Sequence, residues 1–500
     1  MSSGSLFSCC RTRSSFNILL VSWSFMVLFC SYNMVQEFAT SLYPAGLGNE
    51  SLGVLYVACA ISVFAAPGLT NQMGPRFTMV LGAACYVVYL LSLIHIIPWV
   101  VLIMSTVIGF GGAILWIALG VFITQNSTKD TYGQNTGIFW SIFQLCNVFG
   151  NLATYLFFSQ LTNTFWLFVG FAIIGTVGTF MLIFLRKAKN IEEEEQEKLL
   201  ADQDPNSINV HTVKLTEIML KDTRPFKERF HDFLQDVMKA FKLIFTKDMA
   251  LLIPMYFFSG LELAFWSGEF SQMINTNVIG LVLTFTGIGE VIGGIFFGKL
   301  SDYAGRSASI LTGAVCYATG LGLACYMRYS GWMPAPVFAG APLVAYIAAF
   351  LFGLGDSSFN ANCYAICAQL YQDGPQDSTT DEHDEHHHEH DHSPLLHNEH
   401  ITTLSSTHHI HQQNKKNNKS VEGITNSVGA FTIFQLVQNI GSAVGFFYGL
   451  PIPMHDPNPS EGQYGTYIQA YIQYATLVVA TIMFVTVDRI HAREGRAGAK

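Results

Sequence analysis

Charged residues are scarce in this sequence of 500 residues: 12% of them are Asp, Glu, Lys or Arg, whereas half are hydrophobic. Soluble domains carry roughly 25% charged residues, so the composition excludes an ordinary soluble protein. Apolar runs of about 20 residues, which cross roughly 30 Å of hydrocarbon, recur along the whole chain. The sequence therefore predicts a protein embedded in a lipid bilayer.

Motifs of enzymes are also missing. The chain has no Walker loop, no dinucleotide fingerprint after a strand, no nucleophile elbow and no HExxH helix. Its cysteines show no CxxC spacing, and most of them lie inside apolar runs, where they act as small hydrophobic residues. We therefore expect no enzymatic activity, no cofactor and no nucleic-acid partner. The expected partners are the lipid bilayer, a small solute or ion and, in one alternative, another membrane protein.

Twelve apolar runs predict twelve transmembrane helices, six on each side of a hydrophilic segment at 187–248. The expected spans are 16–38, 51–70, 76–96, 99–122, 136–159, 164–186, 249–270, 278–299, 307–327, 340–370, 424–448 and 466–487. This layout indicates an all-α polytopic protein with an N-terminal bundle at 16–186 and a C-terminal bundle at 249–487. Two such bundles facing a central cavity are typical of duplicated transporters.

Lysine and arginine set the predicted orientation. One set of loops holds nearly all basic residues near the span ends, and the other holds only Arg328. The positive-inside rule then places the N-terminus (1–15), the central segment (187–248), an insert at 371–423 and the C-terminus (488–500) in the cytosol. Within the central segment, apolar residues recur at helical spacing over 225–247. That pattern predicts an amphipathic helix on the inner membrane surface or on the end of the bundle.

A glycosylation sequon on the opposite side of the membrane makes Asn49 a candidate for a glycoprotein modification. The sequon lies so close to the second span that an unused site is an equal alternative.

Two cytosolic segments resemble acidic dileucine sorting signals, in which one acid precedes two adjacent leucines. They end at Leu199–Leu200 and at Leu395–Leu396. They favour an endosomal or lysosomal membrane, with the plasma membrane as the alternative, although such short patterns also arise by chance.

The 371–423 insert holds most of the 16 histidines, interleaved with Asp and Glu. Imidazoles and carboxylates bind zinc and similar ions, so the insert is a candidate for a weak metal or pH sensor. We favour the simpler interpretation of a low-complexity loop. The candidate ligands are His386, His387, His388 and His390.

Acidic residues inside predicted spans are the main candidates for function, because an ionisable group in a membrane is costly. Glu262, Glu290 and Asp356 lie deep in their spans, and no Lys or Arg lies deep enough to pair with them. They suit a proton-coupling carboxyl or a cation site. Glu37 and Glu269 lie near span ends, where we expect contact with headgroups or water.

Neighbouring side chains extend this candidate site. The spacing of Glu262, Trp266 and Glu269 places them on one helical face, so that one cavity wall could present them together. Asn33 adds polarity in the first span, and amides recur at matching places in the fifth and eleventh spans. The latter fit hydrogen bonding between helices as well as contact with a substrate.

The segment Gly298–Arg306 resembles the signature loop of the major facilitator superfamily, G-x-L-x-D-x-x-G-R. We interpret Asp302 and Arg306, with Gly298 and Gly305, as a cytosolic latch that bridges helix ends and favours one access state. The first-half counterpart, Pro67 to Arg76, has Asn71 where the signature has Asp.

Further segments resemble the uncoordinated-93-like family of that superfamily, in its solute-carrier-like branch. They are Ser31–Asn33, Gly109–Trp116, Gly137–Gln144, Gly260–Phe270 and Gly353–Asn360. The resemblance implies the major facilitator fold and alternating access. It favours a secondary transporter of unknown solute, with a non-transporting regulator or trafficking partner of channels or receptors as the alternative.

Overall fold

A computed structural model describes residues 13–43, 46–127, 131–158, 164–187, 238, 242–274, 276–329, 343–372, 429–449 and 459–497. These residues form helices and short turns, with no strand among them. The first half comprises α2 (Arg13–Leu42), α3 (Leu47–Ser62), α4 (Ala66–Met73), α5 (Pro75–Ser92), α6 (Pro98–Gln125), α7 (Tyr132–Phe143), α8 (Leu145–Phe158) and α9 (Thr164–Ile183). The second half comprises α13 (Lys247–Ala264), the π-helix η3 (Phe265–Phe270), α14 (Thr276–Ala304), α15 (Arg306–Tyr329), α16 (Leu343–Gln372), the helix Gly429–Gly449 and α18 (Pro459–Ala497).

The described helices confirm an all-α polytopic membrane protein. Ten of them are long and apolar enough to cross a bilayer. The predicted span 51–70 corresponds to a shorter helix, α3, followed by α4, and the span 136–159 corresponds to α7 and α8. A turn at Gln144 separates α7 from α8, where the Asn147 amide N–H donates to the Gln144 carbonyl at 3.2 Å. The count of twelve spans stays a prediction.

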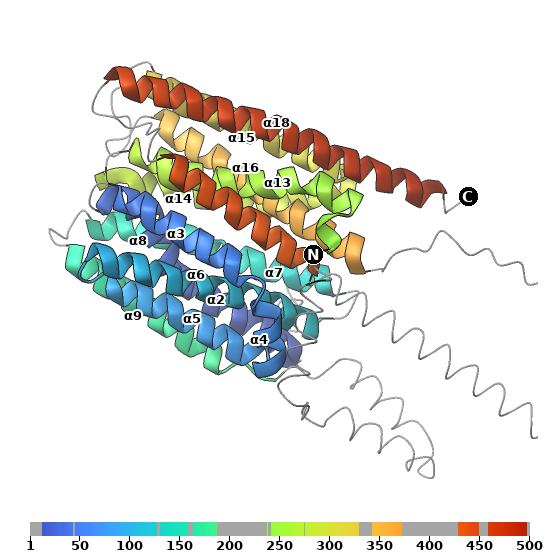
Figure 1. The fold of residues 1–500 in the computed structure, drawn as a ribbon, viewed down its shortest axis with the longest axis horizontal. Helices are drawn as coiled ribbons and strands as arrows, with labels where there is room; N and C mark the ends of the chain where they lie inside the picture. Colours follow the sequence, from blue (N-terminus) through green and yellow to red (C-terminus); the bar gives the residue numbers. More distant parts are fainter. Residues whose placement is uncertain are drawn as a thin grey trace, which may run out of the picture.

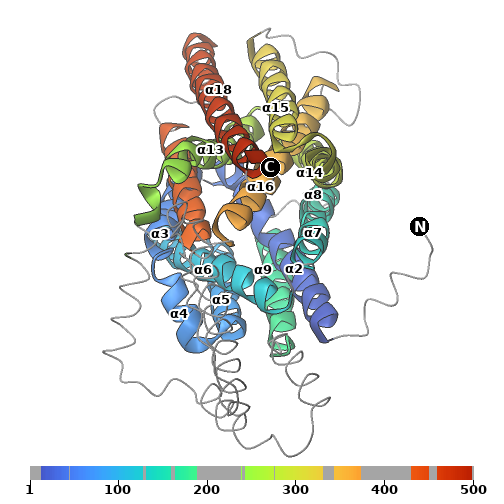
Figure 2. The ribbon, with the colours of Figure 1, turned by 90° about the vertical axis from the view of Figure 1, so that its right-hand side faces the viewer.

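The two halves lie side by side along the bundle (Figure 1). In the first half, α2 packs on α9, and α6 packs on α3 and α5; in the second, α16 packs on α14 and α15, and α13 packs on α18. Contacts between the halves join α8 to α14 and α2 to η3. In the end-on view the helix Gly429–Gly449 lies beside α3 (Figure 2), and Tyr56 of α3 stacks on its Phe446.

The outer faces of the bundle are apolar and exposed. Phe180 on α9 is 57% exposed, Val315 on α15 is 65% exposed and Ile482 on α18 is 59% exposed. Side chains of this kind avoid water but fit hydrocarbon. The bilayer is thus the natural environment of these faces.

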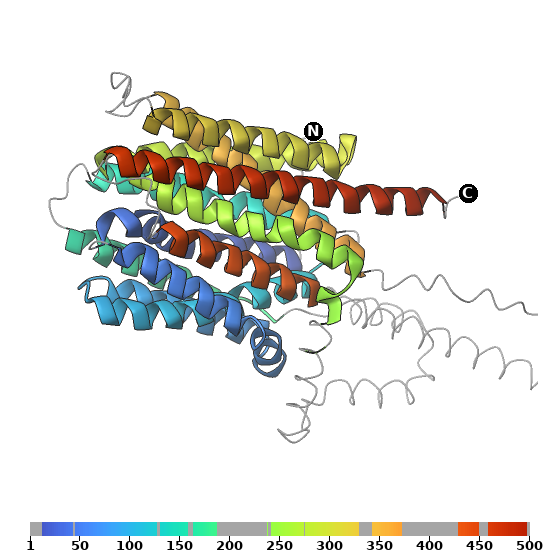
Figure 3. The same ribbon diagram turned by 45° about the horizontal axis from the view of Figure 1, so that its top comes forward.

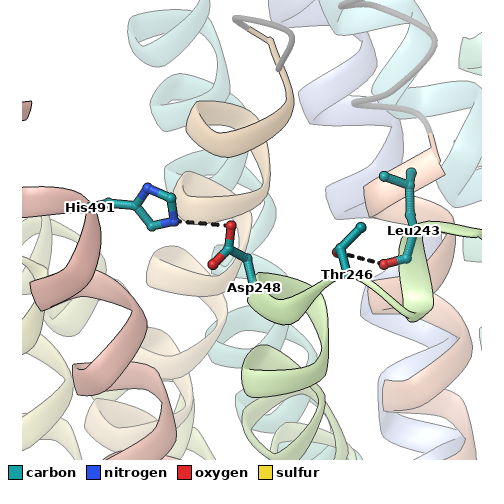
Figure 4. Close-up of polar contacts among 4 residues, drawn as sticks. All are labelled: Leu243, Thr246, Asp248 and His491. Atoms are coloured by element: carbon teal, nitrogen blue, oxygen red, sulfur yellow. Dashed lines mark hydrogen bonds and ion pairs between the residues drawn. The ribbon is translucent and has the colours of Figure 1, made fainter. Parts of the chain in front are cut away.

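One end of the bundle, here called the terminal face, carries the start of α2 and of α13 and the ends of α9 and α18 (Figures 1 and 3). Polar bonds tie these helix ends together within each half. In the first half, Asn17 Nδ2 donates to the Arg186 carbonyl at 3.0 Å and to Asn126 Oδ1 at 2.8 Å. In the second half, His491 Nε2 of α18 lies 3.2 Å from Asp248 Oδ2 of α13 (Figure 4). The opposite end is called the far face.

Matching turns at the terminal face support the internal duplication. The turn between α4 and α5 contains Gly74 with φ 79°, and the turn between α14 and α15 contains Gly305 with φ 86°. Residues with a side chain rarely adopt this left-handed backbone region. Each half therefore uses a glycine at the same place, although Asp302 of the second turn corresponds to Asn71 in the first.

Several predicted features lie outside the described residues. They are the two dileucine segments, the histidine-rich insert and most of the predicted amphipathic helix. Of the last, residues 238 and 242–247 are described, and Leu243 and Ile244 pack against the hydrophobic core.

Candidate functional site

A cavity of about 170 Å³ lies between the two halves. α2, α3, α5, α6, α7 and α8 line it from the first half, and α13, η3, α14, α16 and the helix Gly429–Gly449 line it from the second. The lining combines carboxyl, amide and aromatic side chains, and none of the described residues that line it is Lys, Arg or His. A polar cavity of this kind between two bundles of a membrane protein is the place where a solute can bind.

Four carboxyl groups are buried around this cavity. Glu262 of α13 is 0% exposed, Glu37 of α2 is 1%, Glu290 of α14 is 2% and Asp356 of α16 is 6%. The expectation that Glu37 and Glu269 contact headgroups or water is wrong, because helices of both halves cover them; Glu269 is 3% exposed. The reason is that α2 and η3 pack against each other at the far face, where the sequence shows only span ends.

A chain of hydrogen bonds crosses from the first half to the second. Asn33 Nδ2 of α2 donates to Asn147 Oδ1 of α8 at 2.6 Å. Asn147 Nδ2 in turn donates to Glu290 Oε2 of α14 at 2.6 Å. The amides of the fifth span thus act between helices, and Asn147 also lines the cavity.

A second chain lies in the other half. Gln438 Nε2 donates to Asn360 Oδ1 at 3.1 Å, and Asn360 Nδ2 donates to Asp356 Oδ1 at 2.9 Å. The Glu262 carboxyl lies near that of Asp356, and neither Glu262 oxygen has a hydrogen-bond partner among the described residues.

The π-helix η3 changes which residues of the seventh span reach the cavity. Trp266 lines it, whereas Glu262 lies behind the cavity wall beside Asp356. Glu269 lies near Asn49 and Gly449 at the far face. The predicted single wall of Glu262, Trp266 and Glu269 is therefore wrong, because a π-helix has more residues per turn than the α-helical spacing assumes.

Aromatic side chains form the cavity wall nearest the terminal face. Trp116 of α6 stacks on Trp140 of α7, with ring centroids 5.9 Å apart. Trp140 contacts Tyr364 of α16 across the two halves, with centroids 5.2 Å apart. These three side chains are half-buried, in contrast to the fully buried carboxyl groups deeper in the bundle.

The proposed latch residues are only partly brought together. Asp302 is exposed, and Gly298 has no neighbour near its Cα. Arg306 instead lies close to the carboxylate of Asp488 at the end of α18. Asp488 Oδ2 also accepts a 3.0 Å hydrogen bond from the Ser307 amide N–H. Sequence reasoning missed Asp488, because nothing in the linear chain links it to the α14–α15 turn.

Asn49, the sequon asparagine, lies in the first turn of α3 and is 8% exposed. A glycan needs an accessible side chain, so this burial argues against modification in the folded state. Gln36 is a further polar residue of the first span. Its Oε1 accepts hydrogen bonds from the hydroxyls of Tyr32 and Tyr56, both at 2.9 Å.

Comparisons with known proteins agree with this architecture. Residues 44–379 match the profile of the family described as "Ion channel regulatory protein UNC-93". The chain is 28% identical to "UNC93-like protein MFSD11" of Xenopus laevis, over 89% of this chain and 92% of that protein. It is 27% identical to "Protein unc-93 homolog A" of Bos taurus, over 71% of this chain and 81% of that protein.

Solved structures of transporters share the fold at low sequence identity. The nucleoside transporter NupG superposes with a TM-score of 0.54 at 11% identity, covering 94% of this chain and 99% of that one. A peptide transporter POT superposes with a TM-score of 0.56 at 11% identity, covering 95% of each chain. The family profile covers about two-thirds of the chain. The helices pack in two matching halves, as in the solved transporters. The chain is therefore a member of the UNC-93 family with the fold of major facilitator transporters.

Proposed function

We propose that this protein is a secondary transporter that works by alternating access. The observation that carries the proposal is the polar cavity between the halves, which carboxyl groups line and whose described lining residues include no basic side chain. Buried acids in a membrane protein commonly mark the path of an ion or substrate. The similarity to nucleoside and peptide transporters supports the same function class through the fold.

The two halves are in hydrogen-bonded contact at the far face. There, Thr40 Oγ1 of α2 donates to the Gly268 carbonyl of η3 at 3.1 Å and lies 3.3 Å from Ser271 Oγ. Toward the terminal face, the half-buried Trp140 and Tyr364 border the cavity. We infer that the cavity opens toward the terminal face, and that this face is cytosolic, as the basic residues of its loops favour.

Glu262, Glu290 and Asp356 are assigned as the coupling or cation-binding carboxyls, with Trp266 and Asn33 as positioning residues. Glu290 is linked to the first half through Asn147, and Glu262 lies beside Asp356 within the second half. A proton or cation that binds one of these groups changes the charge at the contact between the halves. Such a change can shift the equilibrium between two access states.

A disulfide lock tests alternating access directly. A comparison of metabolites in cells with and without the gene first identifies the solute. Uptake of that solute is then measured for a Thr40→Cys, Ser271→Cys double variant. Oxidation should fix the far face closed and stop uptake, and reduction should restore it. The matched control, Asn17→Cys with Arg186→Cys, links two helix ends within one half and should leave uptake intact. Uptake that persists in the oxidised far-face variant would refute alternating access.

Neutralising the coupling carboxyl gives a second test. Glu262→Gln should abolish uptake while the protein still reaches its membrane at normal abundance, whereas Glu50→Gln, on the exposed start of α3, should be neutral. Normal uptake by the Glu262→Gln variant would remove that residue from the mechanism.

The alternative function is that of a membrane regulator. It draws on the description of the matching family as ion channel regulatory proteins. A partner helix would dock on the exposed apolar faces of the bundle. Stoichiometric co-purification of a channel or receptor, together with uptake that is insensitive to the far-face lock, would favour this function. The membrane in which the protein resides, plasma membrane or endolysosome, stays a prediction from the dileucine segments.

A further inference from the structure

We propose that the cavity binds a small organic cation, an amine or quaternary ammonium ion that also carries a hydrogen-bond acceptor. This inference rests on the proposed transport function for its role, but it concerns the chemistry of the binding site itself.

Charge is the first argument. Glu37, Glu290 and Asp356 line the cavity, and no described residue of the lining is basic and offsets them. An uncompensated acid in a low-dielectric site is stabilised by a bound cation and repels an anion. Glu37 lines the cavity, its Oε2 is buried without a hydrogen-bond partner among the described residues, and the Asn151 side chain lies near this carboxyl group. An ammonium group in the cavity would give Glu37 Oε2 a donor.

The aromatic wall is the second argument. Trp116, Trp140 and Tyr364 form a continuous set of ring contacts on one side of the cavity. Faces of Trp and Tyr attract cations through their quadrupole, and aromatic cages are the usual means of binding quaternary ammonium groups. The same rings also provide an apolar surface for the organic part of such a ligand.

Buried donors without an acceptor indicate that the ligand also carries a hydrogen-bond acceptor. Trp266 Nε1 and Asn439 Nδ2 belong to residues that line the cavity, are buried and have no acceptor in the described structure. A buried donor without an acceptor is unfavourable, so a ligand oxygen near them would be favourable. The preferred ligand thus joins a cationic head to a hydroxyl or carbonyl oxygen.

An inorganic cation fits less well. Among the described residues, no three His, Cys, Asp or Glu side chains come close enough to hold a metal ion. Ions such as Ca²⁺ take six to eight oxygen ligands, and the aromatic wall supplies few. The volume of about 170 Å³ slightly exceeds that of a cavity of about 150 Å³ that holds benzene. It suits a compact organic molecule.

Binding of radiolabelled choline to the purified full-length protein tests the proposal. Choline combines a quaternary ammonium with a hydroxyl group, and uridine, glycyl-sarcosine and acetate serve as neutral, zwitterionic and anionic competitors. We expect saturable choline binding that excess tetramethylammonium or 2-phenylethylamine displaces and that the three competitors do not. Glu37→Gln should weaken choline binding about tenfold or more.

Matched variants separate the site from general damage to the fold. Trp140→Ala should weaken choline binding severalfold, whereas Trp140→Phe should retain most of it. The controls are Trp166→Ala, on a side chain that is 61% exposed on α9, and Glu50→Gln; both should bind as wild type does. All variants should elute from size exclusion as wild type does.

The proposal is overturned if monodisperse wild-type protein binds none of the three cations up to about 10 mM, a concentration roughly tenfold above a weak Kd of 1 mM. It is also overturned if uridine or acetate displaces choline, or if Glu37→Gln and Trp140→Ala bind choline normally. Failure of transport has a different outcome: choline binds as expected, yet reconstituted vesicles accumulate none of it. Conversely, if reconstituted vesicles transport uridine but the protein does not bind choline, the proposed transport function stands and the cation site is refuted.

Discussion

The Asn147 side-chain amide of α8 donates a 2.6 Å hydrogen bond to Glu290 Oε2 of α14, and this bond joins the two halves of the protein beside the cavity. Asn147 is 4% exposed and Glu290 is 2% exposed, so both partners of this bond are buried. The bond is therefore placed to affect both the stability of the described state and the exchange between access states.

Replacing the donor should destabilise the described state. Asn147→Ala removes the hydrogen bond to a buried carboxyl, which typically contributes about 1.5–3 kcal/mol. We expect a lower midpoint of thermal unfolding in detergent. Gln125→Ala, at the exposed end of α6, is the control and should leave the midpoint unchanged. In a double-mutant cycle, Glu290→Gln should lose much of its effect in the Asn147→Ala background, and strict additivity would contradict the coupling.

Close packing of α14 on α16 should make Gly353 intolerant of a side chain. A Cβ at this position would lie 2.0 Å from the backbone carbonyl oxygen of Thr286, and neither backbone can move independently of its helix. Gly353→Ala should therefore cost about 1–3 kcal/mol or more, seen as a loss of monodisperse protein. Gly298→Ala on the same α14 meets no atom within 4 Å and should be neutral or slightly stabilising. Equal yields of the two variants would contradict the packing argument.

At the α14–α15 turn, we expect Asp488, and not Asp302, to affect stability and the access equilibrium. Asp488→Asn weakens the contact with Arg306 and the hydrogen bond to the Ser307 amide. We expect it to lower the unfolding midpoint and to shift the access equilibrium, measured as cysteine accessibility of the cavity from the terminal face. Asp302→Asn should change neither quantity, because that side chain is exposed. The opposite ranking of the two variants would restore the latch as the signature motif predicts it.

Trp140 and Tyr364 should limit access to the cavity from the terminal face. Their rings are in contact across the halves, so Trp140→Ala should open a path to deeper residues. A cysteine at Gln36 should then react faster with a water-soluble thiol reagent applied from that side, whereas the lipid-facing control Trp166→Ala should leave the rate unchanged. An unchanged rate in Trp140→Ala would show that the pair does not restrict entry.

Much of the architecture could be predicted from residue patterns alone. Apolar run length dictates helices in a bilayer, because every backbone polar group must be satisfied within its own segment. The glycine at position 305 was recognisable from a motif, and its positive φ supplies the physical reason. The identity of the buried acids Glu262, Glu290 and Asp356 also followed from the sequence, because acids stand out in apolar spans.

Contacts between residues that are far apart in the chain could not be predicted from the sequence. The sequence could not pair Asn147 with Glu290, which lie 143 positions apart, or Arg306 with Asp488 on another helix. The π-helix at Phe265–Phe270 makes Trp266 and Glu269 point in other directions than α-helical spacing predicts. No local sequence pattern predicted this π-helix. The matching amides were visible in the sequence, but their partners were not.

By itself, the sequence determined that the chain is a helical membrane protein with two halves and a few costly acids in its spans, since hydrophobic length and charge placement are local properties. Only the tertiary structure decided that Glu37 is buried, that Trp140 and Tyr364 are in contact across the halves, and that Thr40 of α2 is hydrogen-bonded to η3 at the far face. Those features depend on which helix faces meet, and that depends on close contacts between segments hundreds of residues apart.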